Sequence, residues 1–129
     1  MADDEELIRD VWRRWNAGDR RLDPENFDPE FEVHSHLTGD SYRGEERVRT
    51  WMAEIDLQFE SWELGIDEIR FVDDRRALVR GWVRGLGRAS GIELDDPAAW
   101  IVEFRGGRML AVRNFVGRDA VEAAEASVS

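Results

Sequence analysis

The spacing of apolar residues changes character along this chain, and that change restricts the fold more than any other feature. Over residues 4–17 and 45–57 apolar side chains recur every three or four positions, the period of a helix with one buried face. The first stripe is Leu7, Ile8, Val11, Trp12 and Trp15, and the second is Val48, Trp51, Met52, Ile55 and Phe59. Both segments are therefore predicted to be amphipathic helices, the first ending at Gly18.

The remaining segments are predicted to be strands joined by turns. A short strand is expected at 31–37, three longer ones at 62–73, 76–89 and 98–105, and a last one at 109–116 that leads into a helix over 118–125. Residues 105–108, Arg-Gly-Gly-Arg, are typical of a tight hairpin turn. Helices followed by hairpin-linked strands predict an α+β fold, in which helices pack on one face of a curved antiparallel sheet of four to six strands. With 129 residues and no linker-like stretch, the chain is expected to form one domain, 1–129.

Composition narrows the possible partners. The net charge is −11, and a polyanion is repelled by nucleic acid and anionic lipid, so neither nucleic acid nor membrane is an expected partner. Six arginines between residues 70 and 88 form a candidate basic patch, but acidic residues at 67, 68, 73 and 74 interrupt it. The chain has no cysteine, so disulfides and thiolate-bound metals are excluded. An acidic start without a secretory signal favours a cytoplasmic protein, and the exclusive use of arginine for basic residues hints at a bacterial source.

Four stretches stand in a recognisable order, at 12–19, 27–34, 42–46 and 114–124. They are an aromatic helix ending in Gly-Asp, an Asp-Pro before the first strand, a Tyr-Arg-Gly entry to the second helix, and a last strand followed by Arg and an Ala-rich helix. Across essentially the whole chain this order resembles the SnoaL-like branch of the nuclear transport factor 2-like superfamily. The resemblance implies a cone-shaped bent sheet wrapped around N-terminal helices, with an apolar cavity open at one end. It implies no fixed function.

The resemblance also implies homodimers joined through the convex sheet face. Apolar residues expected on that face should then be buried between two copies, because a large apolar sheet face is costly to leave in water. These residues are Val79, Val83, Ile101 and Phe115.

Tryptophan is unusually frequent, with six in the chain. Core packing explains most of them, but wide flat side chains also suit a pocket for a planar apolar ligand. The candidate ligand-binding residues are Trp12, Trp15, Trp51, Trp82 and Trp100, with Ser35 on the apolar side of the first strand. Trp82 and Trp100, in the middle of strands expected to line the cone, are the strongest candidates.

Three polar residues are the candidates for catalysis. His34 can act as a general base near neutral pH, as can His36, or either can lie on a solvated strand face. Two histidines without a clear third ligand make a metal site improbable. Comparison with steroid-isomerase relatives favours Arg80 inside the cone, paired with Glu103, His34 or a ligand anion, although an outward-facing arginine is the alternative. Asn114 can donate to a ligand carbonyl or satisfy a neighbouring backbone group.

This chain lacks the catalytic residues that two known mechanisms of the superfamily require. Its steroid isomerases use a tyrosine and two carboxyl groups where this chain has Val11, Ser35 and Trp100. The scytalone dehydratase pattern also fails, because the one tyrosine is Tyr42, before the second helix. The leading hypothesis is a protein that binds a small, apolar, ring-containing ligand, and that isomerises, cyclises or hydrates it by proton transfer without metal or organic cofactor. The alternative is a non-catalytic ligand-binding or dimerisation domain.

Overall fold

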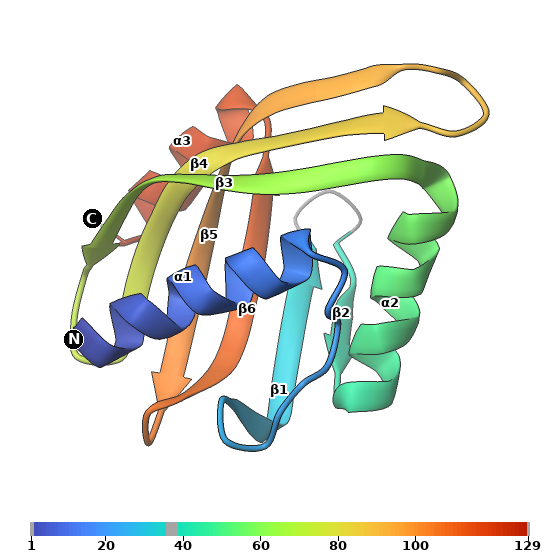
Figure 1. Ribbon diagram of the computed structural model, residues 1–129. Coiled ribbons are helices and arrows are strands. Elements are labelled where there is room, and N and C mark those ends of the chain that lie inside the picture. The colour runs from blue at the N-terminus through green and yellow to red at the C-terminus, as the bar shows by residue number, and fades with distance from the viewer. Residues whose placement is uncertain (1, 36–38, 129) are drawn as a thin grey trace.

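The computed structural model describes residues 2–35 and 39–128. Within these residues, three helices and one six-stranded sheet make up the fold (Figure 1). The elements, in chain order, are α1 (Ala2–Asn16), β1 (Phe27–Ser35), β2 (Ser41–Arg43), α2 (Glu45–Gln58), β3 (Phe59–Phe71), β4 (Arg76–Gly87), β5 (Glu93–Arg105), β6 (Arg108–Val116) and α3 (Arg118–Val128). The α+β prediction is confirmed, and both predicted N-terminal helices and the C-terminal helix are present.

The sheet has the strand order β2-β1-β6-β5-β4-β3 and is curved rather than closed. Strands β3 to β6 form an antiparallel meander, and β1 and β2 form an antiparallel hairpin. The two parts join through β1 and β6, which are parallel. The sheet is therefore mixed, with one parallel pair where an antiparallel sheet was expected, because two strands far apart in sequence meet there without a connecting turn.

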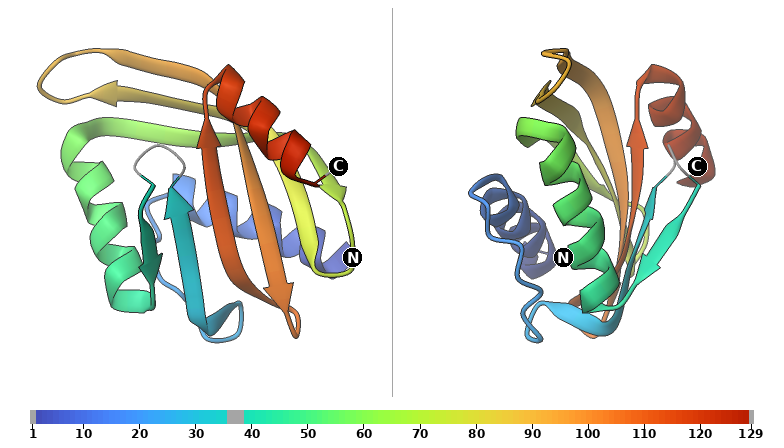
Figure 2. Two further views of the ribbon diagram at one scale, coloured as in Figure 1. Left: turned by 180° about the vertical axis from the view of Figure 1, so that it is seen from behind. Right: turned by 90° about the vertical axis from the view of Figure 1, so that its right-hand side faces the viewer.

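Helices α1 and α2 cover one face of the sheet and α3 covers the other, as the side view in Figure 2 shows. The face toward α1 and α2 is called the inner face below, and the face toward α3 the outer face. The inner core contains side chains from α1, α2, β1, β4, β5 and β6, and partly buried side chains of β3 pack against it. Ile8, Val11 and Met52 in this core are at most 1% exposed. A smaller outer core lies beneath α3.

The outer core overturns the expected dimer surface. Ile101 and Phe115 belong to the outer core, where Ala120 and Ala124 of α3 pack with them. Val79 and Val83 point the other way, into the inner core. None of the four is left for a partner to cover, because α3 and α1 already bury these two sheet faces.

Strands β3, β4 and β5 extend beyond α1 as a long arm, visible at the top of Figure 1. Within this arm Gly65 and Trp82 are register neighbours, and the Trp82 indole lies over the Gly65 backbone. A Cβ added at Gly65 would stand 1.8 Å from Cε2 of Trp82. Only a glycine leaves room for the indole at this position.

We expect Gly65→Ala to lower the free energy of unfolding by about 1–3 kcal/mol, the usual cost of overpacking. The penalty should shrink in a Trp82→Ala background, which removes the clashing ring. Urea denaturation of the two single variants and the double variant measures the coupling. An equal penalty with and without the indole would contradict this packing.

Candidate functional site

One row of side chains crosses the inner face of the sheet from β1 to β4. Ser35 is the register partner of Asn114, Asn114 of Trp100, and Trp100 of Val79. Register partners on neighbouring strands point to the same face. Since Trp100 and Val79 lie in the inner core, Ser35 and Asn114 face the interior as well. Both polar side chains are half-buried.

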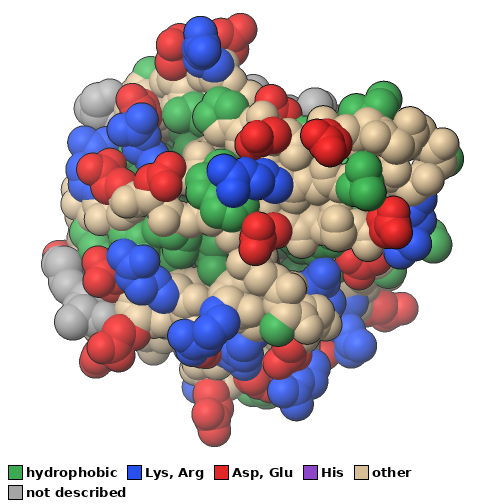
Figure 3. Space-filling model, turned by 45° about the horizontal axis from the view of Figure 1, so that its top comes forward, with side chains coloured by type: hydrophobic (Ala, Val, Ile, Leu, Met, Phe, Trp, Pro, Cys, Tyr) green, Lys and Arg blue, Asp and Glu red, His purple; other side chains and the backbone are tan. Residues whose placement is uncertain are grey.

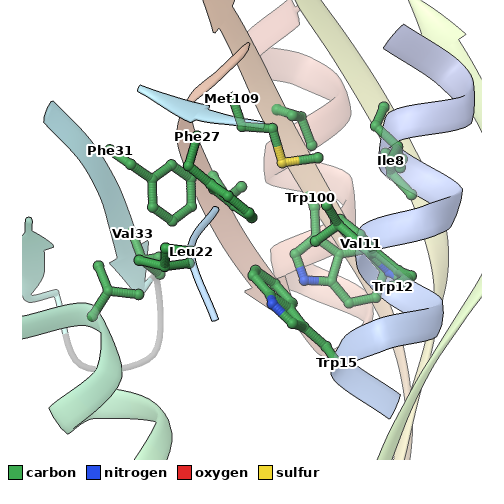
Figure 4. Close-up of a cluster of buried hydrophobic side chains, with 14 of the residues drawn as sticks. Ile8, Val11, Trp12, Trp15, Leu22, Phe27, Phe31, Val33, Trp100 and Met109 are labelled. Carbon is green, nitrogen blue, oxygen red and sulfur yellow. The ribbon is translucent and has the colours of Figure 1, made fainter. Parts of the chain in front are cut away.

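Helix α1 places two further tryptophans against this row (Figure 4). Trp12 meets Trp100 edge to face with ring centroids 5.3 Å apart, and stacks on Trp15 at 5.8 Å. Trp15 in turn stacks on Phe27 at 6.4 Å. The three indoles are at most 6% exposed. Three predicted ligand-binding tryptophans therefore form one cluster, which is called the tryptophan cluster below.

The tryptophan cluster holds an unpaired hydrogen-bond donor. Trp12 is 2% exposed, and its indole Nε1 has no hydrogen-bond acceptor within residues 2–35 and 39–128. A buried donor without an acceptor costs about 1–3 kcal/mol, and such groups in native proteins usually have a bound water or ligand as partner. The indole N–H of Trp12 is thus a buried donor that remains available to an acceptor, although neither of the two depressions described below is lined by Trp12.

The other two predicted tryptophans lie elsewhere. Trp51 stacks on Tyr42 at 5.8 Å, where α2 meets the edge strand β2. Trp82 lies on the outer face, with the guanidinium of Arg84 4.1 Å from its ring centroid. The interpretation of Trp82 as a residue lining the cone was wrong, because the alternating residues Val79 and Val83 occupy the inner face of β4.

The same alternation turns Arg80 outward. Its Nε lies 2.9 Å from a carboxylate oxygen of Glu125 on α3, and its Nη1 lies 3.9 Å from a carboxylate oxygen of Glu68 on β3. The side chain is 49% exposed, so the expected buried cation inside the cone is not found. Acidic and basic side chains lie intermixed over the face of the molecule shown in Figure 3.

His34 also faces outward, since Phe31 and Val33, at 1% exposure each, take the inner face of β1 as their pattern predicted. Its Nδ1 lies 2.6 Å from Oγ of Ser41, and its Nε2 lies 2.8 Å from Oε1 of Glu32. His36 lies outside the described residues. His34 and Arg80 occupy the outer side of β1 and β4, and Asn114 faces inward. The structure nevertheless brings His34 and Asn114 to the lining of one depression, together with Ser35, whereas Arg80 lies away from it.

Sequence reasoning missed Ser41 and Glu32 as partners of His34. The pairs 34 with 41, 33 with 42 and 32 with 43 show that β1 and β2 form a hairpin. These pairs are centred between residues 37 and 38. A hairpin centred on the Thr-Gly-Asp sequence at 38–40 would pair other residues, so the turn sequence alone does not predict the contact between His34 and Ser41.

A depression of about 360 Å³ opens on the outer face next to this histidine. Side chains from four strands line it, among them Glu32, His34, Arg113 and Glu103. A second depression, of about 200 Å³, shares His34 and Arg113 with it. No cluster of three or more metal-ligating His, Asp or Glu side chains is present in the described part of the chain. None of the described helices is long and apolar enough to span a membrane.

Burial alone would raise the pKa of the Glu32 carboxyl group. Hydrogen bonds from His34 and from Nε of Arg43, the latter at 3.1 Å, outweigh burial and hold that pKa below its usual value. Glu32 is therefore a carboxylate at neutral pH and stays charged to a lower pH than an isolated glutamate.

Comparison with known proteins identifies a matching family and several similar structures. A family model described as the SnoaL-like domain matches residues 8–112. A protein assigned as a SnoaL-like polyketide cyclase from Jannaschia sp. CCS1 superposes with a TM-score of 0.80 at 20% identity, over 95% of this chain and 91% of that one. A nuclear transport factor 2-like protein of unknown function from Burkholderia pseudomallei K96243 gives 0.78 at 16% identity, over 97% of each chain. TerC, co-crystallised with polyporic acid, gives 0.79 at 13% identity, over 98% of this chain and 97% of that one. No curated protein matches the sequence.

The curved sheet with two helices on its inner face is the architecture of the nuclear transport factor 2-like proteins. Within that class, the match over residues 8–112 shows that this chain belongs to the SnoaL-like domain family.

We expect Arg80→Met to change the free energy of unfolding by less than about 1 kcal/mol, because an exposed ion pair contributes little. Glu125→Gln, which removes the other partner, is the matched control and should have a similarly small effect. Urea denaturation measures both. A loss of about 3 kcal/mol or more, as when a buried ion pair loses one partner, would contradict the outward placement of Arg80.

Proposed function

We propose that this protein binds a small, planar, largely apolar ring compound between α1 and the inner face of the sheet. The observation that carries the proposal is the buried indole N–H of Trp12, which has no acceptor among the described residues. The aromatic surfaces of Trp12, Trp15 and Trp100 would contact the faces and edges of the ring. The N–H would donate to an oxygen atom on it.

The polar groups of this site favour a neutral acceptor such as a ketone or quinone carbonyl. Trp12, Asn114 and Ser35 are all uncharged, and an unpaired carboxylate buried among them would lose its hydration without a cation to replace it. The amide of Asn114 adds a second possible donor on the same sheet row as Trp100. The co-crystal of TerC with polyporic acid supports the view that this type of fold accommodates a small organic molecule.

Binding has more support than proton transfer. The residue expected to act as general base, His34, hydrogen-bonds Ser41 and Glu32 on the outer side of β1, and Arg80 pairs with Glu125. Donors beside a carbonyl oxygen would stabilise an enolate, so a cofactor-free isomerase or cyclase remains part of the proposal. The alternative is a non-catalytic domain that binds its ligand without turning it over.

The site can be tested with two probes of similar shape, 2-acetylnaphthalene and 2-ethylnaphthalene. We expect Trp12→Phe to weaken binding of the ketone about 2- to 12-fold relative to the hydrocarbon, which corresponds to one hydrogen bond of about 0.5–1.5 kcal/mol. Trp82→Phe, a change on the outer face, is the matched control and should leave both affinities unchanged. Isothermal titration calorimetry measures the six dissociation constants, two for each of the three proteins. If Trp12→Phe weakens the binding of both probes equally, the proposed hydrogen bond to the ketone is wrong. If the wild type binds neither probe, the proposed binding site is wrong.

We also propose that the protein is a homodimer in the cytoplasm and binds neither nucleic acid nor membrane, on the basis of the family resemblance and the net charge of −11. The dimer surface must differ from the one first expected, since Val79, Val83, Ile101 and Phe115 are buried within one chain. Light scattering at micromolar concentration should give twice the 15.0 kDa mass of one chain. A mass of 15.0 kDa would contradict the dimer.

A further inference from the structure

A chain of hydrogen bonds runs across the outer side of the β1–β2 hairpin. Ser41 and His34 are register partners, with Oγ of Ser41 2.6 Å from Nδ1 of His34. On the other side of the ring, Nε2 of His34 lies 2.8 Å from Oε1 of Glu32. Oε2 of Glu32 accepts from Nε of Arg43 at 3.1 Å. The hydroxyl, the imidazole and the carboxylate are therefore connected in series.

The series selects one tautomer of the histidine. A carboxylate can only accept, so the nitrogen facing Glu32 must carry the proton, and His34 is the Nε2–H tautomer when neutral. Its Nδ1 then has a lone pair directed at the hydroxyl of Ser41, which donates to it. Serine nucleophiles are activated by this arrangement: a base within hydrogen-bond reach of the hydroxyl, held in place by a third group.

The surroundings provide space and positive charge. The 360 Å³ depression on the outer face is lined by His34, Glu32 and Arg113. Arg113 of β6 is the register partner of His34, so its side chain starts from the same sheet face one strand away, about 5 Å from it. A guanidinium there can stabilise negative charge that develops on an ester oxygen. Ser41 is exposed, so a substrate can approach its hydroxyl.

We propose that Ser41 is the nucleophile of a second, outer site that hydrolyses small activated esters. Oγ of Ser41 attacks the ester carbonyl carbon while Nδ1 of His34 takes the hydroxyl proton, and Arg113 stabilises the oxyanion. The carbon–oxygen bond to the alcohol then breaks, and the alcohol leaves with the proton from His34. Water, deprotonated by His34, attacks the acyl-serine, releasing the carboxylic acid and restoring the Ser41 hydroxyl. Glu32 is a positioning residue that fixes the tautomer of His34 and stabilises its imidazolium form.

The test uses the full chain with 4-nitrophenyl acetate and follows 4-nitrophenolate release together with the intact protein mass. We expect turnover, with one acetyl group found on the peptide that contains Ser41. Ser41→Ala should abolish the adduct and the turnover, and His34→Gln should lower the rate about 100-fold or more. Ser61→Ala, an exposed serine on β3, is the matched control and should leave both unchanged. Turnover that persists in Ser41→Ala, an acetyl group only at another residue, or no turnover by the wild type would overturn the proposal.

The role of Glu32 has its own measurement. In ¹⁵N NMR spectra of a His36→Asn variant, which leaves one histidine, neutral His34 should be protonated at Nε2 only. Glu32→Ala should mix the two neutral tautomers and slow ester hydrolysis, whereas a merely structural glutamate would leave the tautomer unchanged. Circular dichroism establishes that each variant is folded, so loss of activity in a folded variant is informative. An unchanged tautomer and rate in Glu32→Ala would remove Glu32 from the mechanism.

Discussion

The edge-to-face contact of Trp12 with Trp100 is the interaction on which the inner half of the molecule depends. It joins the first helix to the middle of β5, a strand with neighbours on both sides. Trp15 and Phe27 extend the same aromatic cluster toward the start of β1. One aromatic face of α1 thus sets the distance of the helix from the sheet.

Most of the fold follows from patterns in the sequence. The apolar stripe of α1, the alternation of Phe31 and Val33 and the Gly-Gly turn before β6 each predicted a local structure that is present. Side-chain direction in β4 was not predictable. Leu78 and Val79 are adjacent and both fully buried, because helices cover this part of the sheet from both sides. The alternation of apolar and polar residues along a strand reveals which side chains face the core only when the other face of the sheet is exposed to solvent.

The candidate sites were predictable to different degrees. Trp12, Trp15 and Trp100 were selected as residues of a ligand pocket, with core packing as the alternative explanation, and the structure places all three in one buried aromatic cluster. Trp82 has the same residue type and similar neighbours in sequence, but its position over Gly65 depends on strand pairing across a turn. The partners of His34 likewise depend on the register of a hairpin. Contacts between strands require a register that composition does not contain.

The parallel pairing of β1 with β6 has a consequence for synthesis of the chain. Val33 pairs with Val112, so the first hairpin cannot join the sheet until nearly the whole chain has been made. Among the described strands, β2 pairs with β1 alone. The hairpin therefore has no further strand to pair with while α2, β3, β4 and β5 are being synthesised. Docking of the hairpin is therefore a late event with a large loop-closure cost, and the two parts of the sheet meet only after translation of the last strand.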